Sequence, residues 1–251
     1  MKQYLQCAMD IGEQMLVSGA EVHRVEDSVT RLCKAFGAKR IDVFIITSSM
    51  VVTIFDEEGK SYTQTRRIMG TGTDMEKLHR LNHLSRKACQ EQMSIEEIQK
   101  ELKQCMDSKP YPFWVICFVY ALIAAAFTAF FGGNVKEIIA SPIIGLGTSF
   151  VVYFSERIGM NTILEKFICS FWVTVCAFVF MRTGFIGSVD KVIIGNIMTL
   201  IPGIGLTSAL RDLFTGDSIA GLLRSVEAVL NALAISAGYF LFVWLMGGAL
   251  V

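Results

Sequence analysis

The stretch LIPGIGLTSALRDLFTGDSIAGLLRSVE, residues 200–227, is the most informative segment of the chain. It begins in an apolar run and breaks at Pro202-Gly203. It then carries four charged residues before a last apolar run: Arg211, Asp212, Asp217 and Arg224. Charges at the edge of membrane-length segments are costly and are usually functional. Because a Pro-Gly break also frees backbone groups that need protein or water partners, the stretch is typical of the discontinuous helices of transporters.

Charge and hydropathy divide the chain into two parts. Its 251 residues are 53% hydrophobic, and the mean hydropathy of +0.49 is high for a soluble domain. Of the 23 basic and 23 acidic residues, 16 of each precede Tyr111. We therefore predict a cytoplasmic α+β domain over residues 1–109 and a transmembrane domain over residues 110–251. The net charge of zero gives no reason to expect a nucleic-acid partner.

The pattern of the first part predicts helices, then strands, then helices. Apolar residues recur at helical spacing in residues 2–18 and 20–37. Runs of β-branched and aromatic residues predict strands at 41–47, 50–55 and 61–68. Two more helices are expected at 74–89 and from a capping-box-like start at Ser94 to about residue 107.

Five membrane spans are expected in the second part, at about 113–131, 138–154, 165–181, 190–210 and 226–250. The predicted fold class is thus an α+β cytoplasmic domain followed by an all-α polytopic membrane domain of five transmembrane helices. No apolar signal segment follows Met1, and Lys and Arg residues are concentrated on one side of the spans. We expect a multi-pass protein of the inner cell membrane with a cytoplasmic amino terminus.

Metal and cofactor chemistry have little support in the sequence. The seven cysteines form no CxxC pair or Cys/His cluster, which favours reduced, packed thiols. His79 and His83 lie four residues apart on a predicted helix, but no third metal ligand is evident. The sequence also has no P-loop. We expect no metal, no cofactor and no catalytic residue.

The last predicted helix has one polar face. At about 100° per residue, four polar residues from its start lie within an arc of roughly 80°: Asp217, Arg224, Glu227 and Asn231. One interpretation is the wall of a substrate pathway, in which Arg224 would bind a substrate carboxylate and Asp217 or Glu227 would bind a proton or an ammonium group. The other is an interfacial set of salt bridges, with Arg224 paired to Glu227. The sequence leaves both interpretations open.

The broken helix supplies the other candidate pathway residues: Asn196, Thr199, Pro202, Gly203 and Gly205. A helix end near Gly203 would present backbone amides or carbonyls to a ligand or ion, although a kinked packing helix would have the same pattern. We place the substrate site at residues 196–205. Arg211, Asp212, Asp217, Arg224 and Glu227 would form its inner rim.

A polar cluster in the first part is the remaining candidate site: Gly19, Glu21, His23, Arg24, Glu26 and Asp27. A histidine beside carboxylates can act as a base or proton relay. No Ser or Cys nucleophile is placed by the sequence to complete a triad. We therefore favour a solvated helix face, or a face on which the membrane part docks.

Three segments resemble the threonine/serine exporter family: SGAEVHRVEDSVTRL at 18–32, FGGNVKE at 131–137, and LIPGIGLTSALRDLFTGDSIAGLLRSVEA at 200–228. The resemblance covers nearly the whole chain. It implies a cytoplasmic α+β domain followed by membrane helices, here in the split form whose second half is a separate small membrane protein.

The resemblance also implies a function. It implies proton-coupled export of small carboxylate-bearing metabolites, either threonine and serine or dicarboxylates such as succinate. The expected partners are the substrate, membrane lipid and a second membrane subunit of the same family, in an oligomer. Two alternatives remain, a membrane-anchored enzyme and a regulatory subunit that acts through the cytoplasmic domain.

Overall fold

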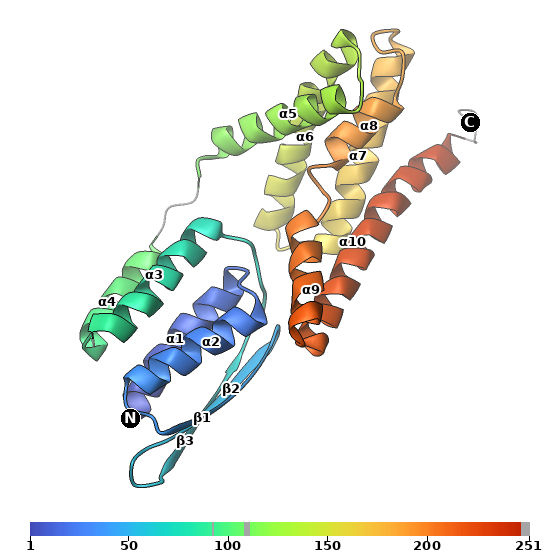
Figure 1. Cartoon of the computed structure of the whole chain (residues 1–251). Helices are drawn as coiled ribbons and strands as arrows, with labels where there is room; N and C mark the ends of the chain where they lie inside the picture. Colours follow the sequence, from blue (N-terminus) through green and yellow to red (C-terminus); the bar gives the residue numbers. More distant parts are fainter. Residues whose placement is uncertain (92, 108–110, 247–251) are drawn as a thin grey trace. The chain divides into compact units, whose positions relative to one another are not determined.

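The computed structural model describes residues 1–91, 93–107 and 111–246 (Figure 1). These residues form ten helices and one three-stranded sheet. The chain divides into two compact units, and the described residues of Met1–Lys109 together with Gly205–Ser225 make up the first. Those of Pro110–Ile204 and Val226–Val251 make up the second. The predicted domain boundary at residues 109 and 110 lies outside the described residues.

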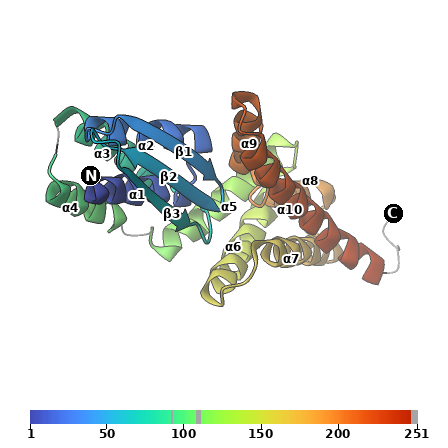
Figure 2. The same cartoon turned by 90° about the horizontal axis from the view of Figure 1, so that it is seen from below.

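The first unit is built in three layers. Its helices are α1 (Lys2–Val17), α2 (Val22–Ala35), α3 (Met75–Glu91) and α4 (Ile95–Met106), and its strands are β1 (Arg40–Ile46), β2 (Ser49–Phe55) and β3 (Ser61–Arg67). The strands pair antiparallel in the order β1-β2-β3. Figures 1 and 2 show α1 and α2 against one face of the sheet, with α3 and α4 on the far side of these two helices.

Period-two alternation fixes which face of the sheet is buried. Met50, Val52 and Ile54 on the central strand are fully or almost fully buried, while their neighbours in sequence are partly exposed. Since successive strand residues point to opposite faces, this register places the apolar set under α1 and α2. The strands predicted at 41–47, 50–55 and 61–68 are confirmed within one residue at each end.

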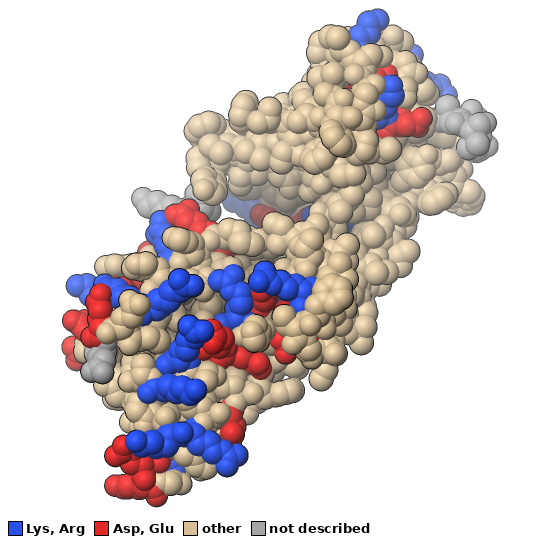
Figure 3. Space-filling view, in the orientation of Figure 1, with Lys and Arg blue, Asp and Glu red and all other residues tan. Residues whose placement is uncertain are grey.

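The second unit holds α5 (Phe113–Phe130), α6 (Val135–Arg157), α7 (Thr162–Arg182) and α8 (Asp190–Ile197). Two more helices, α9 (Gly203–Thr215) and α10 (Ser218–Leu245), are shared between the units. The C-terminal part of α10 packs on α7, where the Ser170 hydroxyl donates to the Ile235 carbonyl at 2.7 Å. On the face shown in Figure 3, charged side chains are spread over the first unit, whereas the second presents a broad uncharged surface.

The predicted fold class is wrong in two respects. Among the described residues, four helices are long and apolar enough to cross a membrane, not five: α5, α6, α7 and α10. The predicted span at 190–210 is instead two shorter helices separated at residues 198–202. An eight-residue helix such as α8 covers about 12 Å, far less than the roughly 30 Å of a bilayer core.

The second error concerns the cytoplasmic domain. A separate α+β domain was expected, but Gly205–Ser225 groups with the first 109 residues. Ala220 at the start of α10 belongs to the same hydrophobic core as Leu5, Val25 and Met50. The unit is therefore completed by a distant segment of the chain. The end of the last predicted span, at 247–250, lies outside the described residues.

Candidate functional site

Side chains of α9 and α10, on either side of the turn that joins these helices, contact the residues just before α2. Arg211 Nη1 donates to Glu21 Oε1 at 2.9 Å, and Arg224 Nη2 donates to the Ala20 carbonyl at 2.7 Å. Arg224 Nη1 also lies 3.1 Å from Asp212 Oδ2. We call this region the junction, and define it as Ala20, Glu21, Glu26, Arg211, Asp212, Asp217 and Arg224. All of these residues belong to the first unit.

Close helix packing brings the junction charges together. Gly216, with a φ of +98°, allows the chain to turn sharply after α9, and Asp217 N donates to the Asp212 carbonyl at 2.9 Å. A Cβ atom on Gly221 would lie 2.8 Å from the Leu213 amide nitrogen. Only glycine permits this approach, which sets Arg224 beside Asp212.

Asp212 is a buried carboxylate with an imperfect partner. Its side chain is 1% exposed, and neither oxygen has a donor aligned for a hydrogen bond; the contact with Arg224 is an ion pair by distance. Burial raises the pKa of Asp212, and the charges of Asp217 and Glu21 raise it further. Arg224 and the Val22 amide at the first turn of α2 act in the opposite direction.

Glu26 is the second perturbed carboxyl group at the junction. It accepts a hydrogen bond from the Ile45 amide at 3.2 Å, which ties α2 to β1. Burial raises the pKa of Glu26. The bond from Ile45 and the charge of His23 oppose this rise, and Asp217 adds to it.

Three other motif residues, His23, Arg24 and Asp27, are exposed. Asp27 pairs with Arg31 at 2.9 Å. Arg24 and Asp27 line a polar pocket of about 310 Å³ between α2 and α3.

Gly19 holds the turn between α1 and α2 in place. Its φ is +93°, and an added Cβ atom would lie 2.6 Å from the Gly72 carbonyl oxygen. Gly72 N in turn donates to the Val17 carbonyl at 2.8 Å. The loop before α3 thus closes directly on this turn, and both fix the start of α2 that receives Arg224.

We expect Gly19→Ala to destabilise the first unit by about 2 kcal/mol or more, because it adds strain at positive φ to a backbone clash. The measurement is the thermal unfolding of the purified protein in detergent. Gly59→Ala is the matched control, since Gly59 has a φ of +79° but no atom within 4 Å of an added Cβ. Equal losses for the two variants would show that the contact with Gly72 contributes nothing.

The second unit has a buried polar patch around Asn196. Asn196 is 1% exposed. Its Nδ2 donates to the Val192 carbonyl at 2.9 Å, and its buried Oδ1 has no hydrogen-bond partner. Thr199 Oγ1 donates to the Asn196 carbonyl at 2.8 Å. On the neighbouring helices, the hydroxyls of Thr128 and Ser141 lie 2.6 Å apart.

The remaining predicted pathway residues are more exposed. Gly203, Gly205 and Glu227 are exposed, and Pro202 is half-buried. Asn231 is half-buried, with a buried Oδ1 that has no hydrogen-bond partner. Within the described residues the ion pair of Arg224 is with Asp212, so the alternative pairing with Glu227 is wrong.

The structure places the predicted residues in two groups. Arg211, Asp212, Asp217 and Arg224 belong to the first unit with the motif of α2. Asn196, Thr199, Glu227 and Asn231 belong to the second.

Sequence reasoning missed Glu137 as a buried group. Its side chain is 1% exposed, and it accepts bonds from Asn134 N at 2.8 Å and from the Ser188 amide at 3.0 Å. The spacing of Asn134 and Glu137 is a capping-box signal that could have revealed it. Because its oxygens have these donors, Glu137 anchors the loop before α8.

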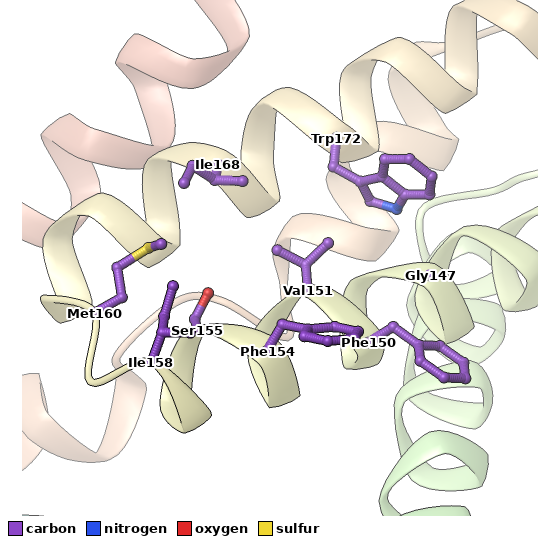
Figure 4. Close-up of a pocket in the computed structure, with 9 residues that line it drawn as sticks. All are labelled: Gly147, Phe150, Val151, Phe154, Ser155, Ile158, Met160, Ile168 and Trp172. Carbon is purple, nitrogen blue, oxygen red and sulfur yellow. The ribbon is translucent and has the colours of Figure 1, made fainter.

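A pocket of about 490 Å³ lies between α6 and α7. Figure 4 shows its lining, which includes the apolar side chains of Phe154, Val151 and Trp172. Among the lining residues, Ser155 carries the only side-chain oxygen. The pocket offers no charge to a carboxylate, so it is not our candidate substrate site. Among the described residues, no group of three or more His, Cys, Asp and Glu side chains is placed to hold a metal ion.

Comparison with known proteins identifies the family. The model of the family described as "Putative threonine/serine exporter" matches residues 6–246. The chain belongs to the threonine/serine exporter family. The two "Probable succinate transporter subunit YjjP" proteins, of Klebsiella aerogenes and Escherichia coli, are 24% and 21% identical to it. The alignments cover 97% and 93% of this chain, and 92% and 91% of those relatives.

A longer relative is known from yeast. "Pheromone-regulated membrane protein 10" of Candida glabrata is 24% identical over 92% of this chain, which spans 33% of that protein. No solved structure matches the chain. This member of the threonine/serine exporter family is thus a multi-pass membrane protein of a transporter family, with four candidate spans among its described residues.

Proposed function

We propose that this chain is one subunit of a secondary, proton-coupled exporter of small carboxylate-bearing metabolites. The substrates would be threonine- and serine-type amino acids or dicarboxylates such as succinate. The family membership and the two relatives named as transporter subunits support this proposal. A second membrane subunit of the same family would complete the pathway, in an oligomer in the inner membrane with a cytoplasmic amino terminus.

The observation that carries the proposal is the buried Asp212–Arg224 pair at the junction. An ion pair of this kind is costly to bury, and one use for it is to fix one of two alternative arrangements. A transporter needs such an element, because its access must alternate between the two sides of the membrane. The junction joins α2 to the start of α10, the last candidate span.

Within this proposal the substrate site is near Asn196 and Thr199, followed by Pro202, Gly203 and Gly205. The unpaired Oδ1 of Asn196 can accept a bond from an ammonium or hydroxyl group. Arg211, Asp212, Asp217, Arg224 and Glu227 are kept as the inner rim that the sequence predicts, and Asn231 as a further pathway residue. The transporter family favours this function over an enzyme, and the contacts of Ala20 and Glu21 favour a docking role for the motif of α2.

The test is transport by proteoliposomes that contain this chain and its second subunit. We expect movement of labelled threonine, serine or succinate that accelerates when a pH gradient is imposed. Liposomes with this chain alone are the control, and they should be inactive. If the pair moves none of these three compounds with or without the gradient, the proposed function is refuted.

A further inference from the structure

The junction holds more acid than base. Four carboxyl groups, of Glu21, Glu26, Asp212 and Asp217, share the region with the guanidinium groups of Arg211 and Arg224. Carboxylates this close disfavour one another's ionisation. The charge balance of the junction therefore favours the uptake of a proton, and the bonding of each carboxyl group indicates which one receives it.

Three of the four carboxyl groups are less suited to hold the proton. Glu21 accepts a bond from Arg211, and Glu26 accepts one from the Ile45 amide. Asp217 is half-buried, although its Oδ2 lacks a hydrogen-bond partner. Asp212 is 1% exposed, and neither of its oxygens has an aligned donor. A carboxylate so placed is costly unless it is protonated or fully paired.

The charged and polar groups that act on Asp212 come from α10, from the turn before it and from the start of α2. Arg224 on α10 supplies the positive charge, and the backbone amide of Val22, at the amino-terminal end of α2, faces the carboxyl group as a donor. Asp217 in the turn and Glu21 before α2 supply negative charge. Arg211, its neighbour on α9, bonds to Glu21 instead.

We propose that Asp212 is a proton-binding site, and that the bound proton holds α9 and the start of α10 against the amino-terminal end of α2. The proposal rests on the proposed function, because it assigns the coupling proton to one residue. When the proton passes to water, an ionised carboxylate remains with two imperfectly aligned partners, Arg224 and the Val22 amide. Separation of the α9–α10 turn from α2 then hydrates it.

The direction of the pH effect follows from linkage. Burial raises the pKa of Asp212 in the docked state, whereas a hydrated aspartate titrates near its ordinary pKa of about 4. The docked state therefore binds the proton more tightly and is favoured at low pH. As the pH rises between these two pKa values, opening should become more favourable by up to about tenfold per pH unit.

Hydrogen–deuterium exchange of the purified full chain in lipid nanodiscs tests this. After correction for intrinsic exchange rates, protection of the amides of residues 22–29 should fall with rising pH, by up to about tenfold per unit. Asp212→Asn, which mimics the protonated group, should keep these amides protected at every pH. An unchanging wild type, or a variant with the wild-type slope, would overturn the proposal.

Two more variants test whether the pH dependence comes from Asp212. Asp10→Asn removes a partly exposed carboxylate that pairs with Arg66 in the same unit, and it should leave the pH profile of residues 22–29 unchanged. Asp217→Asn removes a neighbouring negative charge, so the fall in protection should begin to level off at a lower pH. If Asp212→Asn does not fold, an unshifted profile for Asp217→Asn overturns the proposal.

Transport separates this inference from the proposed function. In proteoliposomes with the second subunit, a pH gradient should accelerate the wild type but not Asp212→Asn. Equal acceleration of both refutes the assignment to Asp212 and leaves the proposed function intact. A wild type that transports without any response to the gradient refutes proton coupling in the proposed function, and the exchange data then decide whether Asp212 binds a proton.

Discussion

At pH values where Asp212 is ionised, Arg224→Ala should destabilise the first unit by about 3–5 kcal/mol, which is the usual cost of leaving one partner of a buried ion pair alone. The substitution leaves Asp212, 1% exposed, without its positive partner and also removes the bond to the Ala20 carbonyl. The midpoint of thermal unfolding should fall by on the order of 10 °C. Asp212 in this variant can become neutral by taking up a proton. The loss of unfolding free energy should therefore be smaller at pH 5 than at pH 8.

Arg211→Ala is the matched control. Its side chain is 63% exposed, and it pairs with Glu21 at 2.9 Å, so its removal should cost at most about 1 kcal/mol. The double variant Asp212→Asn with Arg224→Ala should recover part of the stability lost in Arg224→Ala, because no buried charge remains. If Arg224→Ala is no less stable than Arg211→Ala, the pair does not hold the junction together.

Gly195→Ala should abolish transport and destabilise the second unit by about 1–3 kcal/mol or more, the usual cost of overpacking. An added Cβ atom would clash with Thr128 Oγ1 and lie 2.7 Å from the Thr128 amide nitrogen. Since that nitrogen is backbone, α5 and α8 must separate. The 2.6 Å contact between the hydroxyls of Thr128 and Ser141 would be strained as well.

Gly187→Ala provides the comparison for Gly195→Ala. Its added Cβ atom would come no closer than 4.0 Å to any atom, at Glu137 Oε1, so transport and the unfolding midpoint should stay near wild type. Adding Thr128→Ala to Gly195→Ala should restore only part of the stability, because the backbone contact persists. Wild-type transport by Gly195→Ala would show that the close approach of α5 and α8 is not required.

Local patterns predicted many of the elements. The strands within residues 41–68 were predicted from the alternation of neighbouring side chains, and they are confirmed. The helix after Ser94 was predicted from its capping box, and it is confirmed too. The break at Pro202 is confirmed too, since α9 begins at Gly203. The predicted span at 190–210 was wrong because an apolar window does not distinguish one membrane crossing from two short helices.

The sequence by itself determined the family, the long apolar helices and the positions of caps and breaks, since these depend on neighbouring residues. It also singled out Arg211, Asp212 and Arg224 as unusual charges, although their role stays a prediction. Only the tertiary structure decided that Arg224 bonds to the carbonyl of Ala20, 204 residues away, and pairs with Asp212 rather than Glu227. The physical reason is that burial and ion pairing depend on distances between segments that are far apart in the sequence. The helical winding of one segment gives only the angles between its own residues.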